Sequence, residues 1–180
     1  MAADDTLNVR AAPNASSADI GDLAYNASRL EVAGTDASGN WGRIVWEEGE
    51  GWISMRYLES DTVPSILGTT LPAGLTCGGT EPFWSLSMGS NTAFYTDIHD
   101  ANYGLSLQAT QVAEGFRTFP IIIQHTGGDA VTSTIIRPAD CSDGMSDRTY
   151  PWQIDTILST PTEKRFLSGC CHLPIESGFH

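Results

Sequence analysis

Short β-prone segments separated by turn-forming residues run along most of this chain. Runs of β-branched and aromatic residues recur at even spacing through its C-terminal part: FWSLSM, AFYTDI, YGLSLQA, FPIIIQH, AVTSTIIR, YPWQIDTIL and RFLSGCCH. Turn-forming clusters such as MGSN and TGGD lie between them, and the whole chain holds 18 Gly and 9 Pro. Since helical periodicity is weak throughout, this pattern predicts an all-β protein whose C-terminal part is a small antiparallel barrel or sandwich.

The N-terminal part has the same character and divides from the rest at a turn-rich segment. Its pattern predicts strands near residues 7–10, 30–34, 41–46 and 51–54. The segment 61–74, DTVPSILGTTLPAG, has no clear period and contains two prolines. We therefore predict a first domain over residues 1–60, a linker over 61–74 and a second domain over 75–180.

Composition excludes several classes of protein. Hydrophobic residues make up 41% and charged residues 17% of the 180 positions, as in a folded globular protein. The net charge is −13, from 9 basic and 22 acidic side chains, so we expect no binding to nucleic acid or to an anionic membrane surface. No apolar run approaches the ~18 residues of a membrane-spanning helix. The opening MAADDTLNVR lacks the features of a signal peptide.

The four cysteines bear on both stability and compartment. Cys77, Cys141, Cys170 and Cys171 form an even set with no CxxC spacing, so they do not match a zinc site. In a β-domain of this size they most simply form two disulfides, for which three pairings exist. Adjacent cysteines bond to each other only through a strained ring. We therefore favour bonds from Cys77 and Cys141 to one each of the adjacent pair, in a periplasmic or secreted protein whose signal peptide is absent from this sequence.

The N-terminal part resembles a known family. The ordered blocks LNVRAAP, IGDL, LEVAG, GNWGRIVW and GEGWISMRYL are similar to the bacterial SH3-type domain over about residues 6–60. That resemblance implies a small five-stranded barrel in an extracytoplasmic bacterial protein, often used to target cell-wall peptides or glycan. The acidic–aromatic ALYDY groove of signalling SH3 domains is not found, so proline-rich recognition is not carried over.

Large aromatic side chains are unusually frequent in this first domain. Each can bury about 150–250 Å², and a barrel this small needs such volume in its core. Some of them can instead line a groove that stacks on a peptide or sugar. The candidates for that role are Tyr25, Trp41, Trp52 and Tyr57. The acidic run at residues 47–50 fits a solvated hairpin tip.

The second part carries a resemblance of its own. The motifs CGGTEPFW, CSDGMSDRTYPW and LSGCC are similar to an uncharacterised domain of bacterial envelope and lipoprotein-type proteins, over about residues 72–173. The resemblance implies a location in the cell envelope. It carries no activity with it.

The motif around Cys141 allows three chemical interpretations. Asp140-Cys141-Ser142 resembles the start of papain-like cell-wall peptidases, but the apolar helix that would follow a nucleophile is missing. Asp140, Asp143 and Asp147 could offer oxygen ligands to calcium, although their spacing does not match a calcium loop. The third interpretation is turn chemistry, with Asp and Ser caps and a positive φ at Gly144.

Charged and aromatic groups near the cysteines form the last candidate site. A Glu81–Arg148 pair, with the loop aspartates accepting backbone N–H bonds, would hold the loop in place. The same groups could instead form a small polar ligand pocket. The candidate residues are Glu81, Trp84, Asp143, Asp147, Arg148 and Trp152.

Together these observations favour a non-enzymatic binding or adaptor protein of the bacterial cell envelope, with no cofactor and no metal. Its expected partner is a cell-wall peptide, a glycan or an envelope protein. Two alternatives remain open at this stage. One is an inhibitor of an exported lytic enzyme such as a lysozyme, and the other is a cell-wall hydrolase that uses Cys141.

Overall fold

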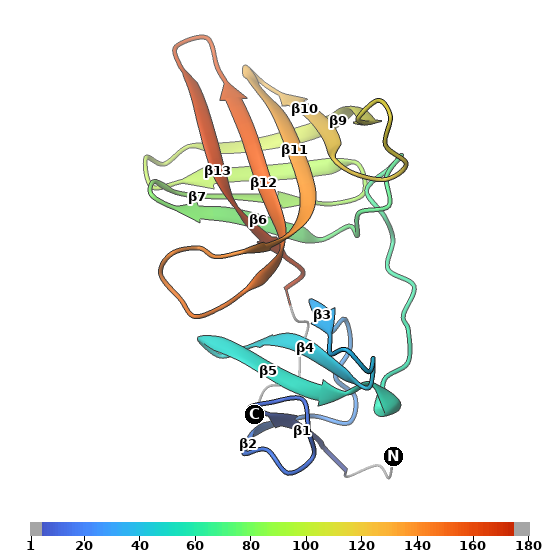
Figure 1. Cartoon of the computed structure of the whole chain (residues 1–180). Coiled ribbons are helices and arrows are strands. Elements are labelled where there is room, and N and C mark those ends of the chain that lie inside the picture. Colours follow the sequence, from blue (N-terminus) through green and yellow to red (C-terminus); the bar gives the residue numbers. More distant parts are fainter. Residues whose placement is uncertain (1–4, 175–180) are drawn as a thin grey trace. The chain divides into compact units, whose positions relative to one another are not determined.

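The computed structural model describes residues 5–174, and they form an all-β protein, as predicted. Strands account for 55% of the chain and helix for 2%. The chain divides into two compact units (Figure 1). The first runs to Thr62 and includes Ser146–Thr149, and the second comprises Val63–Met145 and Tyr150–Leu173. No helix among residues 5–174 has the length and apolar character needed to cross a membrane.

The first unit is a five-stranded antiparallel sheet in the order β2-β1-β5-β4-β3. Its elements are β1 (Leu7–Arg10), β2 (Asp19–Leu23), β3 (Gly34–Thr35), β4 (Trp41–Trp46), β5 (Gly49–Ser54) and a short 3-10 helix η1 (Met55–Tyr57). Along β4 half-buried and buried residues alternate, because successive side chains of a strand point to opposite faces. The inward side chains form one core cluster of Leu7, Val9, Leu23, Ile44, Trp46 and Ile53.

Two strands of this sheet differ from the sequence prediction. The strand predicted over residues 30–34 is reduced to β3, which begins at Gly34. The edge strand β2 was not predicted at all, because four of its five residues are not buried and its sequence DIGDL has no apolar alternation.

The second unit is a closed eight-stranded barrel rather than a sandwich. Its strands are β6 (Leu75–Thr80), β7 (Phe83–Met88), β8 (Thr92–Asp97), β9 (Asn102–Val112), β10 (Ile121–Gly127), β11 (Ala130–Cys141), β12 (Tyr150–Ser159) and β13 (Lys164–His172). Each strand pairs antiparallel with the next along the chain, and β13 pairs with β6 to close the ring (Figure 1). Closure removes the unpaired edges that an open sheet would expose.

Side chains from all eight strands fill the barrel interior. Its core contains large apolar residues such as Leu86, Ile123 and Ile154, all fully buried. The inward side chains of β10, β11 and β12 add a polar group of His125, Thr132, Thr134 and Thr156. The hydroxyls of Thr134 and Thr156 bind each other at 2.8 Å.

A buried ion pair bridges two distant strands of the barrel. Arg165 of β13 binds the carboxylate of Asp97 at the end of β8. The same carboxylate accepts hydrogen bonds from the Tyr95 hydroxyl (3.2 Å) and from the backbone N–H groups of His99 and Ala101. Burial raises the pKa of Tyr95 to about 12. The rings of Trp84, Tyr95 and Tyr103 stack in series beside this network.

The predicted linker over residues 61–74 needs correction. Ile66 and Leu71 are fully buried in the barrel core, and Ser65 forms a β-bridge with Pro72. Most of the segment therefore packs as part of the second unit, which begins at Val63. Its lack of a helical or strand period reflects irregular backbone that buries isolated apolar side chains, rather than a free connection.

Candidate functional site

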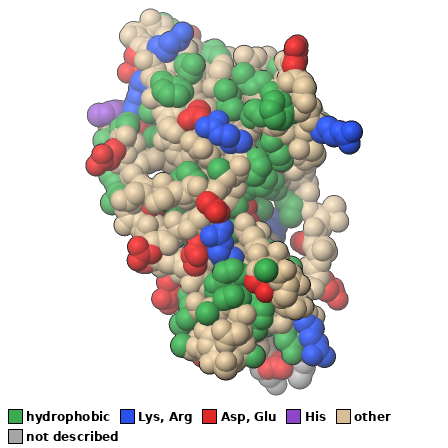
Figure 2. All heavy atoms as spheres, viewed as in Figure 1, with side chains coloured by type: hydrophobic (Ala, Val, Ile, Leu, Met, Phe, Trp, Pro, Cys, Tyr) green, Lys and Arg blue, Asp and Glu red, His purple; other side chains and the backbone are tan. Residues whose placement is uncertain are grey.

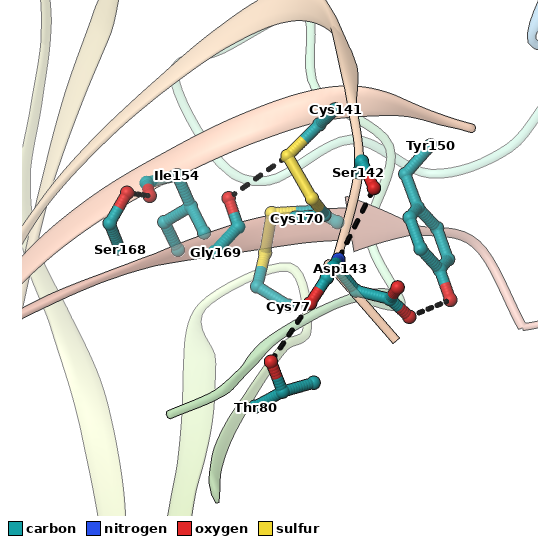
Figure 3. The surroundings of a disulfide bond; sticks show 12 residues. Cys77, Thr80, Cys141, Ser142, Asp143, Tyr150, Ile154, Ser168, Gly169 and Cys170 are labelled. Atoms are coloured by element: carbon teal, nitrogen blue, oxygen red, sulfur yellow. Dashed lines mark hydrogen bonds between the residues drawn. A yellow bond between two sulfur atoms is a disulfide. The ribbon is translucent and has the colours of Figure 1, made fainter. Parts of the chain in front are cut away.

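Two disulfides define one corner of the barrel. Cys77 bonds to Cys171, which is its register partner across β6 and β13. Cys141 bonds to Cys170 and ties the end of β11 to β13 (Figure 3). This is one of the two pairings that the sequence favours. Because the sulfur of Cys141 is bonded, it supplies no thiolate, and the alternative that uses Cys141 as a nucleophile is wrong.

The loop after Cys141 is held by hydrogen bonds to Thr80 of β6, to Tyr150 of β12 and within the loop itself. The Thr80 hydroxyl donates to the backbone carbonyl of Asp143 at 2.8 Å (Figure 3). The Asp143 carboxylate accepts from the Tyr150 hydroxyl at 3.2 Å and from the Met145 N–H at 3.0 Å. Gly144 has φ 74°, as the turn interpretation predicts, and its N–H donates to the Ser142 hydroxyl.

A hollow of about 250 Å³ lies beside this loop. Two of the candidate ligand-binding residues, Trp84 and Asp143, line this hollow together. The other residues that line it are Thr76, Cys77, Gly78, Gly79, Thr80, Ser85, Tyr150, Cys170 and His172.

Tyr150 and His172 are the main residues of the hollow that the sequence analysis missed. Their ring centroids lie 5.4 Å apart, with the planes tilted by 41°. Both residues stand inside motifs that were noted for their cysteines, at the start of β12 and the end of β13. Their position next to the two cysteine segments was the available signal, since the disulfides bring those segments together.

The predicted Glu81–Arg148 pair is wrong. Arg148 belongs to the segment Ser146–Thr149 of the first unit, where its guanidinium contacts the carboxylate of Glu48 at 3.3 Å. Asp147 lies in the same segment and donates its backbone N–H to the carbonyl of Glu48. Glu81 is exposed in the turn after β6. None of the three lines the hollow.

The calcium interpretation and the role of Trp152 also change. Among residues 5–174, no three His, Cys, Asp or Glu side chains converge in a way that could hold a metal ion, so Asp140, Asp143 and Asp147 do not form such a group. Trp152 packs against Phe119, with ring centroids 5.4 Å apart, and against the barrel core. It is therefore a packing residue rather than part of the hollow.

The first unit presents two of its tryptophans on one face. Trp52 lies opposite Arg43 of β4 on one side and Arg10 of β1 on the other. Trp41 is two residues from Arg43, so its side chain points to the same face. Trp41 and Trp52 are thus diagonal cross-strand neighbours, about 7–8 Å apart at the backbone. We call this half-buried pair, with Arg10 and Arg43, the tryptophan face.

Acidic partners neutralise the arginines of the tryptophan face. Arg43 contacts Glu50 at 3.0 Å, and Arg10 lies 3.5 Å from Asp19. The face is therefore aromatic and close to neutral. On the side of the protein drawn in Figure 2, basic side chains lie scattered among acidic, hydrophobic and uncharged ones, without the basic patch that nucleic acid would require.

The two candidate tyrosines are more exposed than the tryptophans. Tyr25 is 53% exposed and lies between β2 and β3, while Tyr57 is 51% exposed at the end of η1. The Arg56 guanidinium lies 5.8 Å from the centroid of the Tyr57 ring. Neither tyrosine lies on a strand of the sheet, so the strand register does not place it on the tryptophan face.

Comparison with known proteins identifies the first unit. Residues 5–59 match the family model of the bacterial SH3 domain, and this part of the chain is such a domain. No curated protein and no solved structure matches the chain. The match does not extend to residues 72–173, where the resemblance to an envelope domain remains a prediction.

Proposed function

We propose that this chain is a non-enzymatic binding protein of the bacterial cell envelope, and that its bacterial SH3 domain attaches it to a cell-wall peptide or glycan. The observation that carries this proposal is the tryptophan face on the domain at residues 5–59. Half-buried indoles offer a large, rigid contact area to a flat ligand surface at low conformational cost.

The charge on this face favours an uncharged stretch of ligand. Both arginines already have acidic partners, so they add little net positive potential for a polyanion. Trp41 and Trp52 then supply most of the binding surface, by stacking on a sugar ring or a peptide unit. This arrangement supports a glycan or peptide ligand over nucleic acid.

The disulfides support the proposed compartment. Bonds of this kind form and persist in oxidising environments, such as the bacterial periplasm or the cell exterior. All four cysteines of the chain are bonded. An extracytoplasmic location would bring the SH3 domain into contact with the cell wall.

Co-sedimentation with purified sacculi tests the proposal. We expect the full chain to pellet with sacculi, and the Trp41→Ala/Trp52→Ala variant to lose about tenfold or more in affinity, because aromatic anchors dominate such interfaces. Phe166→Ala is the matched control, since Phe166 is a 71% exposed aromatic on the barrel. Equal retention of all three proteins, or no retention of the wild type, would refute wall binding through this face.

A further inference from the structure

The outer face of strands β7, β8 and β9 of the barrel is uncharged. β7 and β9 contain no acidic or basic residue, and the one in β8, Asp97, is buried in its ion pair with Arg165. Charged residues usually make up about 25–35% of the surface of a soluble domain. In a chain with a net charge of −13, a face of three strands without charge is therefore suited to an uncharged ligand.

A shallow depression of about 390 Å³ lies on this face. The residues that line it include Ser87 of β7, Thr92 and Phe94 of β8, and Gly104 and Ser106 of β9. Among these five only Phe94 has a large side chain, and it is 47% exposed. We call the site the Phe94 depression. Its volume lies near the lower end of the range for small-molecule pockets, about 300–1,000 Å³.

Gly104 leaves room beside the Phe94 ring. Phe94 is its register partner across β8 and β9, and Ser87 lies opposite Phe94 on the other side, in β7. A Cβ added at Gly104 would meet no atom within 4 Å, so no other side chain fills the space above this glycine. A flat ligand can therefore lie over Gly104 in contact with the exposed part of Phe94.

Hydroxyl groups border the same space. Thr92 and Ser106 are register partners, and both side chains are exposed. Neither hydroxyl is bonded to another residue within 5–174, so both are open to a ligand. The Ser87 hydroxyl lies 3.3 Å from that of Thr76, and binding does not require it. Each free hydroxyl offers one donor and two acceptor positions without charge.

These properties favour a sugar over a peptide. An aromatic ring gives a rigid contact area to the flat face of a sugar ring, and short hydroxyl side chains adapt their hydrogen bonds to its hydroxyls. An extended peptide usually binds by adding a strand at an unpaired sheet edge. β7, β8 and β9 are each paired on both sides in the closed barrel, so they offer no such edge.

We infer that the Phe94 depression binds a short stretch of uncharged glycan. One sugar ring stacks on Phe94 over Gly104, and its hydroxyls exchange hydrogen bonds with Thr92 and Ser106. The site lies on the barrel, separate from the tryptophan face, and does not rest on the attachment proposed for the SH3 domain.

Nuclear magnetic resonance of the ¹⁵N-labelled full chain tests this inference. The probes are two uncharged trisaccharides: chitotriose, which carries N-acetyl groups, and cellotriose, which does not. We expect saturable shifts of the Phe94, Gly104 and Ser106 amides. Preference for chitotriose would assign the site to an amino-sugar polymer such as the wall glycan, and equal binding would assign it to neutral polysaccharides in general. A capped trialanine peptide is the control probe and should leave these amides unchanged.

Two substitutions in the depression provide the second arm. Phe94→Ala removes the stacking surface and should weaken binding about tenfold or more. Gly104→Val fills the space beside the ring and should block binding, while the open space and the strand preference of valine preserve the fold. Phe166→Ala is the matched control, since it removes a 71% exposed ring from another strand of the barrel and should bind like wild type.

Three results would overturn the inference. They are no saturable shift at the depression with either trisaccharide, the same shifts with the capped peptide, and unchanged affinity in Phe94→Ala or Gly104→Val. The Trp41→Ala/Trp52→Ala variant separates the two proposals, because we expect it to keep the shifts at the Phe94 depression. Loss of sacculus binding in that variant would then concern the SH3 domain alone.

Discussion

Gly21 lies at the point where the edge strand β2 passes over the indole of Trp46. Its φ of 153° is rare for residues with a side chain, and a Cβ at this position would overlap the Trp46 ring. That ring is part of the core of the bacterial SH3 domain, and its Nε1 donates to the carbonyl of Ile20. The glycine therefore allows β2 to close over the core.

Replacing this glycine should destabilise the SH3 domain. We expect Gly21→Ala to lower its free energy of unfolding by about 1–3 kcal/mol, the usual cost of overpacking a core. Hydrogen exchange of the β1–β5 amides measures this unit separately from the barrel. Gly49→Ala is the control, since a Cβ there meets nothing within 4 Å. Equal effects of the two substitutions would contradict the packing argument.

His125 is fully buried inside the barrel, and both of its ring nitrogens lack a hydrogen-bond partner within residues 5–174. Its register partner Thr132 is also buried, with a hydroxyl that has none. Burial lowers the pKa of His125 below its usual 6.5, because the apolar interior disfavours the charged ring. The folded barrel therefore holds this side chain neutral.

This burial predicts a loss of stability in mild acid. Above about pH 6.5 the ring is neutral in both states, while below it the unfolded chain takes up a proton that the folded chain refuses. The free energy of unfolding should then fall by up to about 1.4 kcal/mol per pH unit from this group. His125→Leu should have a shallower dependence between pH 7.5 and 5.5 in urea unfolding.

An exposed histidine provides the comparison for this measurement. His99 lies on the surface after β8, so His99→Leu should keep the wild-type pH dependence. If His125→Leu and wild type lose stability in parallel as the pH falls, the buried imidazole does not control the acid response.

At the scale of elements, the pair Asp97–Arg165 links β8 to β13 across the barrel. Burial raises the pKa of Asp97, but the N–H groups of His99 and Ala101, with Arg165 and Tyr95, outweigh it, so the net pKa is lowered. Only 1% of the Asp97 side chain is exposed. Removing it would leave Arg165 partly buried with a charge that has lost its main partner.

We expect Asp97→Ala to cost about 3–5 kcal/mol, as for one partner of a buried ion pair. Asp155→Ala tests a more exposed pair of the same barrel, in which Arg137 lies 2.8 Å from Asp155 and is 40% exposed. That change should cost about 1 kcal/mol or less. Urea unfolding of the two variants measures both losses in the free energy of unfolding. A larger loss in Asp155→Ala than in Asp97→Ala would contradict the conclusion that the more buried pair contributes more to stability.

The strands show how far local sequence determines these elements. All seven strands of the barrel from β7 to β13 follow segments that the sequence predicted, because β-branched and aromatic residues alternate there. The exception is β6, whose LTCGGT sequence looks like a turn. One of its glycines is required by a contact from a strand distant in sequence, since a Cβ at Gly79 would lie 2.8 Å from the carbonyl oxygen of Ser168 in β13. No local pattern contains that information.

At the scale of the whole molecule, the sequence predicted the fold class and the first domain better than it predicted the sites. Trp84 and Asp143 were identified from motifs and do share a hollow. Tyr150 and His172 were missed, and Glu81 was paired with the wrong region, because the strand register and disulfides decide which distant residues meet. Closure of a barrel by β13 and β6 is a long-range property of the same kind.

The tryptophan face lies on the first unit of the chain. Attachment of the protein to the wall through this face is the central claim, because it assigns both the compartment and the role of the SH3 domain.

Fractionation of the producing cells tests that claim most directly. Sacculi are isolated under non-reducing conditions, washed in buffered salt and digested with a muramidase. The protein is detected in each fraction with an antibody, and its free thiols are counted. We predict that it stays with the washed sacculi, is released by digestion and has no free thiol. Recovery in the cytoplasmic fraction with reduced cysteines, or complete loss from sacculi in the first wash, would contradict the account.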